Sequence, residues 1–281
     1  MAAKIRQLLK MYRTYARLDL EFMLRDKRMG LITLLCDWLA TASSVSGIAL
    51  MAVRFEGIGG LTADEILWML GFFTLADGMT WMLLGNNNAL HISRRIGRGQ
   101  VDHMLIQPCP LWMQLLTEGF MPFSGNSGVL AGILLTAAAT ARLHLAVTPG
   151  WIALLLLYIL ARMAVAAGFA YLAGSAAFYR PVSCEELSSV ALDALNAAGK
   201  YPWGSLPLAL QIFFTTLMPV SLLAYLPSMI LLGRLRSPAA SIWPVALGAG
   251  LAALAAATFR KGLNHYAVEG CPRYKDMGHR C

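Results

Sequence analysis

Residues 151–178 read WIALLLLYILARMAVAAGFAYLAGSAAF, and Arg162 is the only charged residue in this apolar run. A helix needs about 20 consecutive apolar residues to cross the hydrocarbon core of a bilayer. The run is long enough to do so. The whole chain has the same character, because 58% of its 281 residues are hydrophobic, 14% are charged and the mean hydropathy is +0.59. We therefore predict an all-α, polytopic membrane protein.

The sequence predicts six transmembrane helices. Four further runs are apolar and long enough, at 30–53, 65–86, 119–141 and 239–259. The remaining span has two candidates, 184–200 and the proline-containing run 203–233. If 184–200 crosses, 203–233 must fold back as a re-entrant outer segment, which a membrane tolerates only where the backbone is buried against protein or lines a cavity.

Basic residues cluster on one side of the predicted spans. Short loops rich in Lys and Arg stay in the cytoplasm, so we predict that both termini are cytoplasmic. The loops at 54–65 and 142–150 contain one Arg each and face the other side. The same clusters account for the net charge of +8. We expect them to pair with anionic membrane lipid rather than nucleic acid, because no nucleic-acid recognition motif accompanies them. The basic residues are Lys4, Arg6, Lys10, Arg13, Arg17, Arg25, Lys27, Arg28, Arg94, Arg95, Arg98, Arg260, Lys261, Arg273, Lys275 and Arg280.

The amino-terminal residues 4–28 have the pattern of an amphipathic helix. At 100° per residue, apolar residues such as Ile5 and Leu9 share one face and basic residues the other, although Asp19 falls on the apolar face. Such a helix is expected to lie along the inner membrane surface. We therefore divide the chain into an interfacial helix at 1–29, a transmembrane domain at 30–260 and a cytosolic tail at 261–281.

A short polar segment, RRIGRGQVDHMLIQPCP at 94–110, separates the second and third predicted spans. Residues 99–106 can form about two helical turns before Pro108 and Pro110 stop the helix. One side of this helix is apolar. Because a membrane bundle offers no cytosolic core, we expect this edge to contact another protein. The edge consists of Val101, Met104 and Leu105.

Four charged residues fall within predicted spans: Asp37, Asp77, Arg162 and Asp193. A charge in lipid is costly, so such residues are candidates for function. Arg162 is the only basic one, and either Asp77 or Asp37 could neutralise it. We favour a structural ion pair. The alternative is an ion-coupled secondary transporter that uses Asp37 or Asp77, and such a protein is expected to show an inverted repeat, which we do not find convincingly.

Other chemistries have little support in the sequence. Gly199-Lys200 is followed by Tyr201, so the phosphate-binding pattern GxxxxGK[ST] is missing and we predict no enzyme activity. A membrane-embedded enzyme or assembly factor, the third alternative, would need acid–base residues clustered at one depth. We predict no metal site, because the tail residues that could bind one match no standard zinc spacing. These are His265, Cys271, His279 and Cys281.

Five motifs, in this order, resemble landmarks of the bacterial type-2 ATP-binding-cassette exporter permeases. They cover most of the chain and most resemble the branch that is encoded as permease pairs beside a drug-exporter-type ATPase. The motifs are ADGMTWMLL (76–84), RRIGRGQVDHMLIQPCPLWMQLL (94–116), KYPWGSLP (200–207), TLMPVSLLAYLPSMILLG (216–233) and KGLNHYAVEG (261–270).

The resemblance implies a permease subunit of the bacterial inner membrane that pairs with a second copy or a related permease. ATP and Mg would be bound by a separate ATPase, with no cofactor on this chain. Residues 4–28 would be the elbow helix and 99–106 the coupling helix, with Gln107 where the family usually has Arg. The implied coupling residues are Gly99, Val101, Asp102, Met104, Leu105 and Pro108. The implied re-entrant segment contains Tyr201, Pro202, Pro219, Tyr225 and Pro227.

Overall fold

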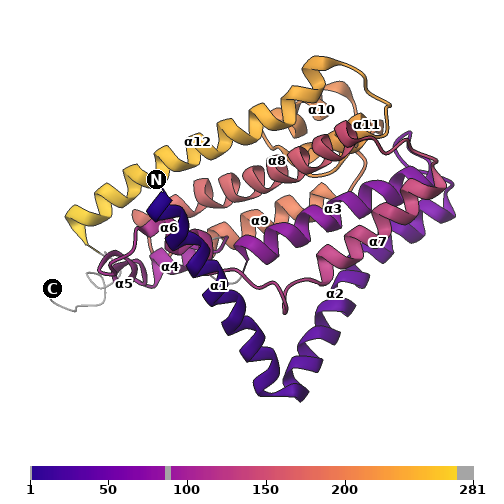
Figure 1. The fold of residues 1–281 in the computed structure, drawn as a ribbon. Helices are drawn as coiled ribbons and strands as arrows, with labels where there is room; N and C mark the ends of the chain where they lie inside the picture. Colours follow the sequence, from indigo (N-terminus) through magenta and orange to yellow (C-terminus); the bar gives the residue numbers. More distant parts are fainter. Residues whose placement is uncertain (1, 86–89, 271–281) are drawn as a thin grey trace.

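The computed structural model describes residues 2–85 and 90–270, and the long elements in these ranges are all helices (Figure 1). The all-α prediction is confirmed. Four helices are long and apolar enough to cross a membrane, judged by length and composition. They are α2 (Lys27–Arg54), α3 (Ala63–Leu84), α8 (Pro149–Gly174, continued by η1 at Ser175–Phe178) and α12 (Pro238–Glu269).

The helix α7 (Ser127–Arg142) has 16 residues and begins later than the predicted third span, 119–141. The start of that prediction is wrong because the chain is held in an irregular path before Ser127. The amide of Met121 donates to the carbonyl of Met82 at 3.0 Å. Gly119 also sits so close to the backbone of Gly85 that it leaves no room for a Cβ atom.

Small residues let α7 pack closely against α3. A Cβ atom at Gly132 would collide with the backbone of Leu75, and one at Gly78 would collide with the backbone of Gly128. Such close approach is typical of helices that pack inside a membrane. The large side chains of α3, including Trp68 and Phe72, are fully buried in the main core.

Neither candidate for the fifth span forms a long helix. Residues 184–200 contain α9 (Leu187–Gly199), which has 13 residues, and the proline-rich run is divided into α10 (Leu208–Thr216), η3 (Val220–Leu222) and α11 (Tyr225–Leu231). Prolines directly before α10 and η3 explain the division, because they cannot continue a preceding helix. Leu192 and Leu195 bury one side of α9.

The amino-terminal helices α1 (Ala2–Arg25) and α2 form a V beside the bundle (Figure 1). The helix predicted over 4–28 ends earlier, because the Asp26 carboxylate accepts hydrogen bonds from the amides of Arg28 and Met29 and so begins α2. Few residues of α2 are buried; they are Gly30, Val45, Ile48 and Ala52.

The last helix continues to Glu269, past the predicted boundary at 260. The buried face of α12 also extends past residue 260, because Phe259 and Tyr266 both contact the ring of Phe178. The division into a transmembrane domain and a cytosolic tail stays a prediction. The part of the predicted tail at 271–281 lies outside the described residues.

Candidate functional site

Two short helices cover the end of the bundle where α8 and α12 finish (Figure 1). They are α4 (Ile92–Gly97) and α5 (Val101–Leu105), and we call residues 92–106 the hairpin. Gly99 joins them with a φ of +69°, which a residue with a side chain adopts only with strain. A helix within 99–106 was expected, and the structure shortens it to a single turn.

Val101 and Met104 are 1% and 3% exposed, so the predicted apolar edge does not face another protein at these two positions. They pack into a second small core that contains Ile92, Ile96 and Phe178. The predicted contact with another protein is wrong at these two positions because it assumed that this end of the bundle has no core. The ends of α8 and α12 and the helix α6 (Leu111–Thr117) create a core of the chain's own at this end.

The opposite side of the hairpin is exposed. Of the predicted coupling residues, Leu105 is 44% exposed, and Asp102 and Pro108 are also exposed. Ile106 is 81% exposed, and sequence reasoning missed it. The only signal for Ile106 was an apolar residue placed just before Gln107 and Pro108, outside the face that contains Val101 and Met104.

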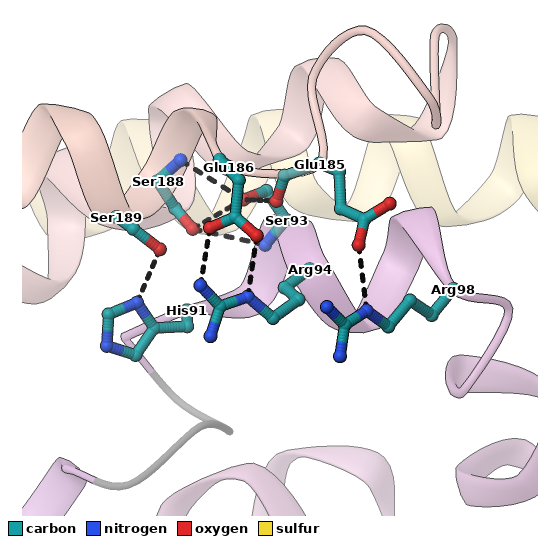
Figure 2. Close-up of polar contacts among 8 residues, drawn as sticks. All are labelled: His91, Ser93, Arg94, Arg98, Glu185, Glu186, Ser188 and Ser189. Atoms are coloured by element: carbon teal, nitrogen blue, oxygen red, sulfur yellow. Dashed lines mark hydrogen bonds and ion pairs between the residues drawn. The ribbon is translucent and has the colours of Figure 1, made fainter.

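Ion pairs attach α4 to the start of α9 (Figure 2). The Arg94 guanidinium donates to both carboxylate oxygens of Glu186, from Nε at 2.8 Å and from Nη2 at 2.5 Å. One helical turn further on, Arg98 Nε donates to Glu185 Oε1 at 2.7 Å. A two-point arginine–carboxylate contact fixes orientation as well as distance. The carboxylate of Glu186 also raises the pKa of Arg94.

Beneath the ion pairs, hydroxyl groups join the same two segments in a buried layer (Figure 2). The Oγ atoms of Ser93 and Ser188 are 2.6 Å apart, and each also accepts the backbone amide of the other residue. Nearby, His91 Nδ1 lies 2.5 Å from Ser189 Oγ. Burial, and secondly the positive charge of Arg94, lower the pKa of His91 below its usual 6.5. The imidazole is therefore neutral at pH 7.

On its other side the hairpin is bound to α6. The side-chain amide of Gln114 donates to the carbonyls of Met104 and Cys109, both at 2.8 Å. Arg95 Nη2 lies 2.9 Å from Glu118 Oε1. The hairpin is thus held by α9 on one side and by α6 on the other.

Within the bundle, Arg162 of α8 is fully buried and pairs with Asp77 of α3, with 2.5 Å between Nη2 and Oδ1. The same guanidinium donates to Thr80 Oγ1 at 2.6 Å and to Asn196 Oδ1 at 3.1 Å. Of the two partners that the sequence left open, Asp77 is the one in contact. Asp193 does not join this group, because it lies on an exposed side of α9.

Asp37 of α2 has a different environment. Its carboxylate accepts a short hydrogen bond from the Ser127 hydroxyl, at the start of α7. A cavity of about 480 Å³ lies between α2, α3 and α7 and is lined by Asp37, Asp77 and Lys200. The two carboxylates that the sequence singled out therefore share one cavity, although only Asp77 is paired with arginine.

At the far end of the bundle, two of the predicted re-entrant residues lie close to glycines. The Tyr225 hydroxyl approaches Gly204, and Pro202 packs against Gly59 of the loop before α3. Pro202, Pro219 and Pro227 are buried, whereas Tyr201 is 49% exposed. At the same end, Arg234 Nε lies 2.6 Å from Glu65 Oε1, so the segment after α11 is tied to the start of α3.

A family model described as "ABC-2 family transporter protein" matches residues 38–270. The chain belongs to the ABC-2 transporter family. Searches of curated proteins and of solved structures give no match. Membership makes the chain a multi-pass membrane permease without an ATPase domain, and ABC-2 permeases typically work with a separate ABC ATPase. The resemblance seen in the sequence is confirmed at this level.

The charged groups described above for this ABC-2 protein lie in three separate places: the hairpin end, the cavity between α2, α3 and α7, and the Glu65–Arg234 contact at the far end. No group of three or more potential metal ligands occurs within 2–85 and 90–270. Cys271, His279 and Cys281 lie outside these ranges.

Proposed function

We propose that this ABC-2 protein is the membrane subunit of an ATP-driven exporter and that the hairpin couples it to a separate ATPase. The observation that carries the proposal is the hairpin's two-sided construction. Contacts with α6, α9 and a buried core lock the hairpin to the protein's own helices, and the surface that contains Leu105 and Ile106 is exposed and free to bind a partner.

The locked side provides a path for mechanical force. Arg94 and Ser93 attach the hairpin to α9, Gln114 attaches it to α6, and Met104 packs into the core shared with α12. Packed interfaces of this kind shift as units rather than deform continuously. A displacement of the hairpin is therefore passed to α9 and α12 together.

The free side provides the docking surface, which we define as Asp102, Leu105, Ile106, Gln107 and Pro108. Ile106 and Leu105 supply apolar area for a groove on the partner, in the manner of other helix-in-groove contacts. Because Gln107 is uncharged where related permeases usually have Arg, we expect apolar contacts to contribute more of the binding than charge.

The proposal includes an orientation. The hairpin end faces the cytoplasm of a bacterial inner membrane, with both termini on that side and α1 along the membrane surface as the elbow. α7 and α9 complete six crossings, with α10 and α11 as the re-entrant outer segment. The exposed length of α2 supports pairing with a second copy or a related permease, so that the translocation path lies between the two.

The membrane charges fit this proposal better than ion-coupled transport. Arg162 already neutralises Asp77, and the cavity that contains Asp37 also contains the cation of Lys200. An ion-coupled transporter needs a carboxylate that gains and loses its ion. Asp37 contacts a hydroxyl group rather than an arginine, so ion-coupled transport can be tested by changing Asp37.

The test is ATP hydrolysis by the complex purified from its native membrane. We expect an ABC ATPase to co-purify with the unaltered chain and Ile106→Asp to abolish this association without changing the thermal unfolding midpoint. Val147→Asp is the matched control, because Val147 is 52% exposed in the loop between α7 and α8. Retention of the ATPase by Ile106→Asp, or proton- or sodium-driven uptake by the chain alone, would contradict the proposal.

A further inference from the structure

A second surface feature includes none of the docking-surface residues and none that line the charged cavity. It is a groove of about 520 Å³ between α6, α8 and α12, on the side of the bundle where α8 and α12 lie next to each other (Figure 1). Many of the residues that line it are small, which leaves the groove unfilled: Ala164, Ala167, Gly168, Ala252 and Ala256.

The groove is apolar along its length and basic at one end. Leu263 and Trp112 form part of its wall near the hairpin end, and Arg260 is the only charged residue within 2–85 and 90–270 that lines it. Arg260 is exposed and forms no salt bridge with any residue of 2–85 or 90–270. A guanidinium that has no salt-bridge partner in these ranges, at the mouth of an apolar groove, favours a ligand with a negative head and an apolar tail.

The length of the groove fits one leaflet of a bilayer. From Ala252 to Leu263, α12 rises by about 16 Å, close to half of the hydrocarbon thickness of about 30 Å. Ala256 and Arg260 are exposed, so the groove opens on the surface of α12 rather than toward the core. Trp112 is 51% exposed beside the basic end, where an indole suits the boundary between acyl chains and headgroups.

We propose that this groove is a binding site for an anionic phospholipid, with an acyl chain along α8 and α12 and the phosphate on Arg260. Basic pockets between transmembrane helices bind acidic headgroups in this way. A zwitterionic lipid would fill the groove equally well but would gain less from Arg260, because its own positive charge offsets the phosphate. The proposal does not depend on the exporter function or on an ATPase.

The experiment is native mass spectrometry of the full chain in detergent, with dipalmitoyl phosphatidylglycerol or dipalmitoyl phosphatidylcholine added. We expect the unaltered chain to retain the glycerol lipid preferentially. Arg260→Gln should reduce its retention about fivefold and leave the choline lipid unchanged. Lys261→Gln is the matched control, because it removes the same charge from the next residue, which does not line the groove.

A second arm tests the apolar part of the site. Ala256→Phe should reduce the retention of both lipids. On the unaltered chain, dihexanoyl phosphatidylglycerol should bind more weakly than the dipalmitoyl form, and this comparison does not depend on whether a variant folds. Equal losses in Arg260→Gln and Lys261→Gln, or equal binding of the short and long lipids, would overturn the proposal. Lipid-free dimers that become monomers in Ala256→Phe would instead assign the groove to a second copy of the chain.

Discussion

Arg94 and Glu186 are 92 positions apart in the chain, and their side chains meet in two parallel hydrogen bonds. This contact joins the first turn of α4 to the residue that precedes α9. It lies at the surface, since the side chains of Arg94 and Glu186 are 29% and 50% exposed. The contact therefore orients α4 relative to α9 more than it stabilises the fold, because exposed ion pairs contribute only about 0–1 kcal/mol.

The first prediction concerns this contact. Arg94→Lys keeps the charge but loses the two-point geometry, so we expect faster amide exchange across residues 92–106 and a change in unfolding free energy of only about 0–1 kcal/mol. Hydrogen–deuterium exchange measures the first effect and thermal unfolding the second. Arg17→Lys, in the exposed Arg17–Glu21 pair of α1, is the control and should leave 92–106 unchanged. Unaltered exchange in Arg94→Lys would show that the contact does not hold the hairpin.

Acidification is expected to loosen the hairpin through His91. In the folded protein the pKa of the His91 imidazole is below the usual 6.5, so the neutral form is favoured. As the pH falls, His91 therefore takes up a proton in the unfolded state before it does so in the folded state. The contribution of His91 to the free energy of unfolding is fully present above about pH 6.5. It decreases below that pH and stops changing once the pH is below the pKa of His91 in the folded protein. Amide exchange of 92–97 at pH 7.5 and pH 5.5 measures the effect. His91→Gln should remove most of the difference, and an equal pH response in that variant would exclude His91 as its source.

Removing the charge of Asp77 should be costly. Asp77→Asn leaves the buried Arg162 guanidinium without its carboxylate, and breaking a buried pair in this way destabilises a protein by about 3–5 kcal/mol. Asp37→Asn is the control, because Asp37 contacts a hydroxyl group and no arginine, and we expect a smaller loss. Thermal unfolding in detergent compares the two. A larger loss in Asp37→Asn would reverse our assignment of the structural ion pair.

The turn inside the hairpin provides a backbone test. Gly99→Ala places a Cβ atom at a φ of +69°, and the left-handed region costs a residue with a side chain about 1–2 kcal/mol. Gly250→Ala, in α12 and with nothing within 4 Å of the added atom, should be neutral or slightly stabilising. Chemical unfolding of both variants measures the difference. Equal stability of the two would mean that the turn relaxes at no cost.

Much of the fold could be predicted because a long transmembrane helix is recognised from the length and composition of its own sequence, without the segments that pack against it. The four long helices each exceed what a bilayer requires, and the runs containing Trp68 and Arg162 were placed correctly. The shorter α7 could not be delimited, since its start depends on contacts between Met121 and Met82 that no local pattern indicates.

The site was harder to predict, for the same reason. Val101 and Met104 form an apolar edge in either interpretation, and only the three-dimensional path of α6, α8 and α12 decides that this edge is buried. Asp19 is a similar case. It interrupts the apolar face of α1, yet its carboxylate accepts the amides of Phe123 and Ser124 at 2.8 and 3.1 Å and so anchors α1 to a segment about a hundred residues away.

The backbone contact of α3 with α7 limits how this permease can move. With Gly132 against Leu75 and Gly78 against Gly128, the two helices cannot slide past one another without steric collision. They form a stationary frame. Any cycle of opening and closing must then take place at the looser seams, above all where the sparsely covered α2 meets that frame.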